Sequence, residues 1–287
     1  MATLVAAMVA IVLVAFAPAA AAPASLTARL WSLVDSNLAI AIVSTFIAAF
    51  AGTWGAQLLA ERTATRKELR SEMRGTNAAL ALAFTIANTY ITTKKQHVRE
   101  LVTLYRAQVA ARQTHRQQVA AGVLPATTPF EYQLEMKTIS VPFSPYRELQ
   151  EILRNRISPD GKALILLTPL IQSIEGFAEI VTERNKWIEE IKALPQDADA
   201  LKAALYFGTP YAPGRVDERY PNFVQGLEMR TDDCIGFAIL IAQSLKAYGD
   251  RLAARYGEGA PKITAGDFSK VGDLLPDMAF YAEWMRN

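Results

Sequence analysis

The stretch from Leu38 to Ala60 limits the fold of this chain more than any other part of the sequence. It runs for 23 residues without a charged side chain and is followed directly by the charged sequence ERTATRKELR. A helix needs about 20 consecutive apolar residues to cross the hydrocarbon core of a bilayer. We therefore predict a transmembrane helix over 38–60, with most of the remaining chain folded as a body attached to the membrane.

Residues 1–24 admit two interpretations. The stretch is uncharged, and 3–17 is almost wholly apolar. A signal peptide has an apolar core of this length and small side chains at its cleavage site, which Ala22-Pro23-Ala24 supplies, but this segment lacks an N-terminal Lys or Arg. Alternatively, 1–24 is an uncleaved first membrane helix that pairs with 38–60. The residues favour neither interpretation over the other.

Charge is distributed unevenly along the chain. Residues 61–118 carry eleven Lys and Arg against four Asp and Glu, whereas 119–287 carry eighteen against twenty-three. Basic residues gather on the cytoplasmic side of membrane helices and are attracted to anionic headgroups. Five basic residues directly follow the apolar stretch: Arg62, Arg66, Lys67, Arg70 and Arg74. We therefore predict a bacterial inner-membrane protein whose body is cytoplasmic. Nucleic-acid binding is not expected, because the bases alternate with acidic and apolar residues.

Small side chains recur every fourth residue within the predicted membrane helix. Residues four apart lie on one helix face, and small residues on such a face let two membrane helices approach closely. The face predicts a homo-oligomer, or packing against the first hydrophobic segment. It comprises Ser44, Ala48, Gly52 and Ala56.

The body is predicted to be all-α. Residues 61–121 contain no proline and one glycine, Gly75, which predicts a long basic juxtamembrane helix. Prolines break the helical pattern over 122–143, where apolar and polar residues alternate as in a short strand or an extended arm. A helical bundle is predicted over 144–287. Its clearest pattern is a seam of alternating three- and four-residue steps, typical of a bundle or coiled coil: Leu164, Leu167, Ile171, Ile174, Ala178, Val181, Asn185 and Ile188. We interpret Asn185 as fixing the register of helix packing.

Recognised catalytic motifs are absent from the sequence. It contains no GxxxxGK[ST], GxGxxG, HExxH, CxxC or GxSxG pattern, and its one cysteine, Cys234, excludes a multi-cysteine metal site. We therefore expect neither a cofactor nor, in the first instance, an enzyme.

A polar cluster in the last long helix is the feature that most needs explanation. It contains Glu228, Arg230, Asp232 and Asp233, and the preceding loop adds Asp217 and Arg219. In one interpretation these residues form a cation site or small-ligand pocket closed by Tyr206, Tyr211 and Tyr220. In the other they form an ion-pair network that pins the loop to the helix.

The segments ALYFG (204–208), VDERY (216–220) and TDDC (231–234), downstream of one apolar span, resemble bacterial membrane-anchored helical proteins with no assigned activity. The resemblance implies no catalytic residue. The sequence as a whole predicts a membrane-tethered cytoplasmic scaffold, sensor or effector that acts through protein contacts. The alternatives are a membrane-tethered enzyme or cation- or ligand-binding bundle that uses the acidic cluster, and a pore-forming oligomer built from both hydrophobic segments.

Overall fold

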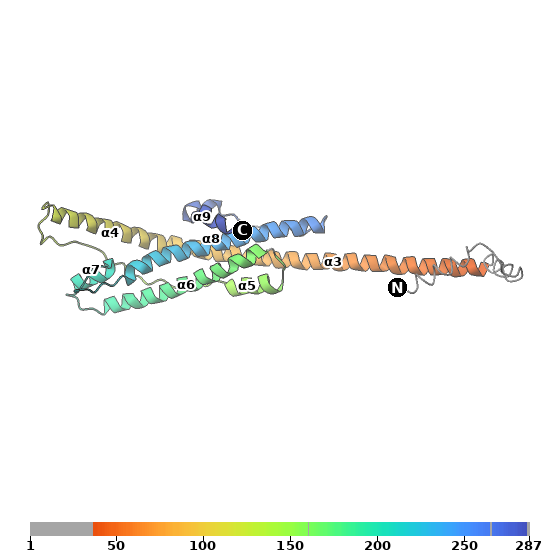
Figure 1. The fold of residues 1–287 in the computed structure, drawn as a ribbon, viewed down its shortest axis with the longest axis horizontal. Helices are drawn as coiled ribbons and strands as arrows, with labels where there is room; N and C mark the ends of the chain where they lie inside the picture. The colour runs from red at the N-terminus through yellow and green to blue at the C-terminus, as the bar shows by residue number, and fades with distance from the viewer. Residues whose placement is uncertain (1–36, 160, 265, 286–287) are drawn as a thin grey trace, which may run out of the picture. The chain divides into compact units, whose positions relative to one another are not determined.

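The computed structural model describes residues 37–159, 161–264 and 266–285, with side chains in these ranges except at 37–43, 46, 47, 282 and 285. Over these residues the chain is helical and contains no strand, which confirms the predicted all-α class (Figure 1). The predicted signal peptide or first membrane helix, 1–24, lies outside the described residues. The chain divides into two compact units, 1–66 and 67–287.

The described part of the first unit is the beginning of helix α3 (Asn37–Thr93). The helix predicted over 38–60 is thus confirmed as a helix, while its place in a membrane stays a prediction. Every described side chain from Ser44 to Arg66 is exposed. Several of these are large and apolar, with exposed fractions of 59% for Phe50, 59% for Trp54 and 67% for Leu59.

In the second unit the path of α3 passes through Gly75 without a break and continues as one π-helical turn, η1 (Lys94–Val98), and then α4 (Arg99–Ala120). One face of α3 is buried here, including Met73, Leu80 and Ile86. A β-carbon on Gly75 would lie 2.6 Å from Cγ2 of Ile157, so the glycine makes room for that side chain. A π-helical turn contains about one residue more per turn than an α-helix. It therefore rotates the side chains of α4 about the helix axis relative to those of α3.

Helices α6 (Gly161–Lys192) and α8 (Arg219–Tyr256) form the centre of the second unit and run side by side (Figure 1). Two glycines bring them close together. A β-carbon on Gly226 of α8 would lie 2.8 Å from Cδ1 of Ile180, and one on Gly176 of α6 would lie 3.1 Å from Nε of Arg230. Each glycine therefore accommodates a side chain of the opposite helix.

Shorter elements pack around this pair. They are α5 (Tyr146–Asn155), α7 (Asp199–Phe207), and a tail made of η2 (Ser269–Leu274), α9 (Met278–Ala282) and η3 (Glu283–Met285). The tail docks on α8 through Tyr281, whose ring occupies the place that a side chain on Gly236 would take.

The buried face of α6 is wider than the predicted seam and partly displaced from it. The bundle is confirmed, and Leu167, Ile174, Val181 and Ile188 are buried as predicted. Leu164, however, is 38% exposed, and a second buried column runs through Leu166, Leu170, Phe177, Arg184 and Ile191. The physical reason is that α6 packs against both α5 and α8, which needs a broader apolar stripe than a two-helix seam.

Among the residues whose side chains the structure describes, which leave out 37–43, 46 and 47 of the 38–60 stretch, α6 is the one helix whose length and composition would let it cross a membrane. Length and composition alone do not place it there, since the core helix of a soluble protein has the same character. In this structure α6 buries Leu166, Phe177 and Trp187 within the bundle. We therefore assign α6 to the bundle core.

Residues 122–143 form an extended arm rather than a strand. Phe130, Tyr132, Leu134 and Met136 pack against the core, as the alternating pattern predicted. Two side-chain amides take the place of a neighbouring strand. Gln108 accepts from the backbone N–H of Gln133 at 2.9 Å and donates to its carbonyl at 2.9 Å; Asn185 does the same for Ile139, at 3.1 Å and 2.7 Å. Asn185 thus holds the arm, and the structure does not give it the predicted role in helix register.

This arrangement makes the arm sensitive to one side chain. Replacing Asn185 by Ala leaves the N–H and carbonyl of Ile139 without their partners, which costs about 1–3 kcal/mol. We expect faster amide exchange and faster proteolysis within 124–145, with the Asn185→Asp variant intermediate because it keeps the acceptor. Asn88→Ala, at an exposed position of α3, is the control. Equal protection of the arm in Asn185→Ala and wild type would contradict the assignment.

Candidate functional site

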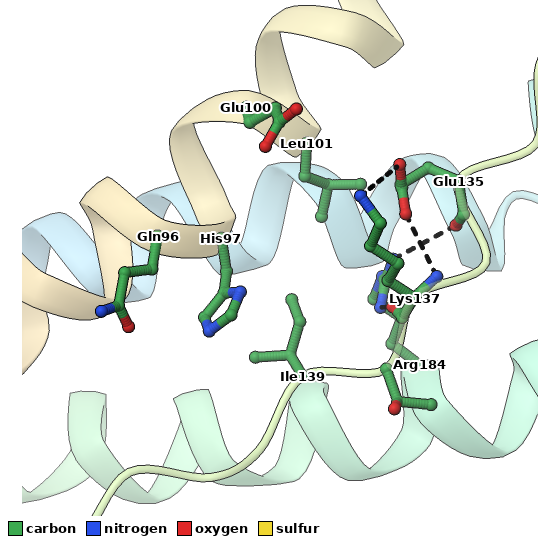
Figure 2. A pocket seen from close by; sticks show the side chains of 9 residues that line it. Gln96, His97, Glu100, Leu101, Glu135, Lys137, Ile139 and Arg184 are labelled. Atoms are coloured by element: carbon green, nitrogen blue, oxygen red, sulfur yellow. Dashed lines mark hydrogen bonds and ion pairs between the residues drawn. The ribbon is translucent and has the colours of Figure 1, made fainter.

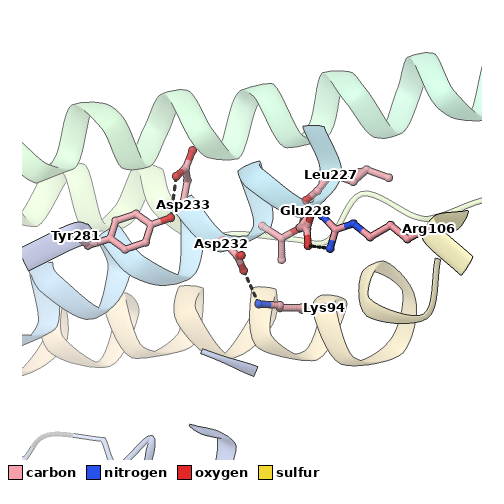
Figure 3. A network of polar contacts seen from close by, with 8 residues as sticks. Lys94, Arg106, Leu227, Glu228, Asp232, Asp233 and Tyr281 are labelled. Carbon is pink, nitrogen blue, oxygen red and sulfur yellow. Dashed lines mark hydrogen bonds and ion pairs between the residues drawn. The ribbon is translucent and has the colours of Figure 1, made fainter. Parts of the chain in front are cut away.

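The acidic residues of α8 do not converge on a shared cation. Asp232 Oδ1 lies 2.5 Å from Nζ of Lys94 in η1. The Glu228 carboxylate accepts two hydrogen bonds from the guanidinium of Arg106 in α4, at 3.1 Å and 2.6 Å (Figure 3). Each carboxylate thus has its own basic partner from the η1–α4 segment. This relieves the repulsion that two acidic residues four apart would otherwise experience.

Asp233 takes part in a different contact, with the C-terminal tail. It accepts a hydrogen bond of 2.9 Å from the hydroxyl of Tyr281 (Figure 3). Its other carboxylate oxygen lies 3.7 Å from Nη1 of Arg230. Burial raises the pKa of Asp233, and the hydrogen bond from Tyr281 and the charge of Arg230 offset only part of that rise. Asp233 therefore anchors the tail rather than extending the pairs made by Glu228 and Asp232.

The loop residues form a third, separate group. Arg219 donates to both carboxylate oxygens of Asp217 at 2.8–3.1 Å and to Glu190 of α6 at 3.0 Å. Burial by itself would raise the pKa of Asp217, but the hydrogen bonds from Arg219 outweigh it and the pKa is lowered. These residues pin the start of α8 to α6, and their ion pairs within the described part of the chain do not include Glu228 or Arg230.

The three tyrosines do not close one pocket. Tyr206 and Tyr220 belong to a buried aromatic cluster, with ring centroids 4.5 Å apart. Tyr105 meets Tyr206 edge-on at 5.5 Å, and the Trp187 ring packs against Tyr220 at 4.6 Å. Burial raises the pKa of Tyr105 to about 12, and it raises the pKa of Tyr206 above that of Tyr105. Tyr211, by contrast, is 42% exposed in the loop turn. Two of the three tyrosines are therefore core residues.

Cys234 is a fully buried core residue. Burial raises the pKa of its thiol well above the ordinary value, and a thiol that stays protonated is a poor nucleophile. Among the described residues, no group of three or more His, Cys, Asp and Glu side chains is arranged to hold a metal ion.

Arg184 of α6 is a buried polar residue that sequence reasoning did not single out. It is 1% exposed, and it donates to the backbone carbonyls of Lys137 at 2.9 Å and Glu135 at 3.4 Å. Figure 2 shows these arm residues with His97 around a cavity of about 70 Å³. That volume suits a few water molecules and excludes a cofactor. The sequence did contain a sign that Arg184 is buried. It stands three residues after Val181 and four before Ile188, a spacing at which a core residue is expected.

The ion pairs can be ranked by exposure, which gives a direct test of their structural role. The Lys94 and Asp232 side chains are 15% and 26% exposed, against 56% and 67% for the Arg99–Asp273 pair. Asp232→Ala leaves the mostly buried ammonium of Lys94 unpaired and should lower the free energy of unfolding by about 1–3 kcal/mol. Asp273→Ala, the control, should change it by less than about 1 kcal/mol. Chemical denaturation of both variants checks this; equal losses would refute the ranking.

Comparisons with known proteins return no family for this chain. No protein-family model matches the sequence, and neither a curated protein nor a solved structure matches it. We therefore infer function from the geometry of the residues described above.

Proposed function

We propose that this chain is a membrane-tethered helical scaffold, with residues 38–60 as its anchor and the unit from Lys67 onward as a cytoplasmic body that acts through protein contacts. One observation carries the proposal. The uncharged first part of α3 is helical, and its described side chains are exposed, including Phe50, Trp54 and Leu59. Burying one such side chain is worth about 1.5–3 kcal/mol, so a continuous exposed stretch of them calls for a lipid or protein environment.

Two groups of basic residues in the chain have different surroundings. Lys94, Arg99 and Arg106 pair with carboxylates of α8 or the tail. Those directly after the apolar stretch, including Arg62, Lys67 and Arg74, are exposed. Exposed basic residues next to a membrane helix favour a cytoplasmic location for the segment they belong to. The second group therefore supports the proposed orientation.

The acidic cluster favours a scaffold over an enzyme. Glu228, Asp232 and Asp233 hold α8 to η1, α4 and the tail, each through its own partner. Catalytic carboxylates work best with an environment that poises them for proton transfer or metal binding. Carboxylates used in this way instead fix the relative positions of helices, as a scaffold needs.

The anchor is tested by protease protection in sealed inside-out membrane vesicles. We expect the unit from Lys67 to be digested and a fragment containing 38–60 to be protected. Two arginines at the centre of the stretch, Ala49→Arg with Phe50→Arg, should abolish that protected fragment, because each costs about 2.5–3.5 kcal/mol at the bilayer centre. Thr168→Arg with Gln172→Arg, at exposed positions of α6, is the matched control.

Three results would count against the proposal. The first is complete digestion of the wild-type chain. The second is a body that is protected in inside-out vesicles but cleaved in right-side-out ones, which would reverse the orientation. The third is loss of a protected fragment in the α6 variant alone, which would make α6 the membrane segment.

We also propose that the anchor self-associates through its small-residue face. Ala48, Gly52 and Ala56 are exposed, and a β-carbon added at Gly52 would meet no atom within 4 Å. Gly52→Leu should therefore reduce crosslinked oligomers in membranes by blocking close helix approach. Thr53→Leu, which adds similar bulk off that face, should leave crosslinking unchanged. If both variants crosslink like wild type, the face is not an interface.

A further inference from the structure

A groove of about 550 Å³ lies where the end of α4 meets the residues that follow α7. One wall is formed by 109–120 of α4, and the other by Phe207 and Thr209. Small-molecule sites commonly have volumes of about 300–1,000 Å³. The groove lies entirely within the second unit, so ligand binding there does not depend on whether 38–60 enters a membrane.

The groove carries two positive charges that no carboxylate in the described part of the chain neutralises. Arg112 and Arg116 are four residues apart on α4, and among the described residues neither forms an ion pair with a carboxylate, whereas Arg99 and Arg106 of the same helix do. Burial lowers the pKa of Arg112, and the neighbouring charge of Arg116 lowers it further. Like charges at this spacing destabilise a helix, and an anion bound between them would remove that cost.

Arg112 is held in place without being neutralised. Its guanidinium carbon lies 4.5 Å from the ring centroid of Phe207, and Nη2 donates to the hydroxyl of Thr209 at 3.2 Å. Both partners flank Gly208, which ends α7 with a φ of 62°. A β-carbon at Gly208 would lie 2.8 Å from Cγ of Pro221, so the turn that places Phe207 and Thr209 needs a glycine. The remaining N–H groups of Arg112 therefore have a fixed direction before any ligand binds, which lowers the entropy cost of binding.

We propose that this groove binds a phosphate monoester, with Arg112 and Arg116 holding the phosphate group. A guanidinium presents a planar fork that matches phosphate oxygens, and two forks suit a dianion better than a single carboxylate. Gln113 and Gln117 on the same wall offer further amide donors. The volume exceeds that of a free phosphate ion, and Val109 and Ala120 provide apolar surface for the organic part of the ligand.

The test uses the full-length chain in nonionic detergent micelles and phenyl phosphate as the probe, followed by calorimetry. We expect saturable binding. Each of Arg112→Ala and Arg116→Ala should weaken it at least about tenfold, because each removes charge-assisted hydrogen bonds to the phosphate. Arg112→Lys should recover only part of the affinity, because it keeps the charge but loses the fork. Arg255→Ala, at an exposed position of α8, should bind like wild type.

Arg116 is exposed, so its Ala variant keeps the test decisive even if loss of the Phe207 and Thr209 contacts disturbs folding in Arg112→Ala. A second arm, with phosphatidic acid doped into the micelles, distinguishes a lipid headgroup from a soluble ligand. Saturable binding in either arm that depends on both arginines supports the proposal. It is overturned by absence of binding in both arms, by benzoate binding as tightly as phenyl phosphate, or by an equal loss in Arg255→Ala.

Discussion

The close contact between α6 and α8 is the interaction on which the rest of the second unit depends. Gly176 and Gly226 each lack a side chain where the opposite helix places one, so Arg230 lies over α6 and Ile180 fits against α8. Close approach of two helices increases the number of van der Waals contacts each buried residue makes. Because α5, α7 and the C-terminal tail then attach to this pair, its geometry determines where these shorter elements can pack.

Polar side chains in this bundle mainly connect elements that are far apart in the chain. Lys94 pairs with Asp232, 138 residues later, and Arg106 with Glu228, 122 residues later. Breaking such a pair leaves a charge partly buried, so these contacts specify one arrangement of the η1–α4 segment against α8. Among the described residues, Arg112 and Arg116 at the end of α4 take no part in this pairing and line the groove instead.

The extended arm shows why the candidate site was only partly predictable. Its alternating pattern was readable in 130–137, and the inward side chains follow it. Its partners were not, because the amides of Gln108 and Asn185 come from two different helices. A helix surface offers many polar positions, and sequence spacing does not say which of them meets a backbone that arrives from elsewhere. The same limit applies to Arg219: its partner Asp217 is 2 residues away in the sequence, whereas its other partner, Glu190, is 29 residues away.

By itself, the sequence determined which segments are helical, where prolines interrupt them, and that the uncharged stretch 38–60 needs an apolar environment. These properties follow from local backbone preferences and from the periodicity of apolar residues, both of which are written along the chain. Only the tertiary structure decided that Glu228, Asp232 and Asp233 have three separate partners, and that Arg184 is buried under the arm. Only the tertiary structure showed that Arg112 and Arg116 share a groove with Phe207. Such pairings depend on distances across the bundle, which neither composition nor spacing along one helix specifies.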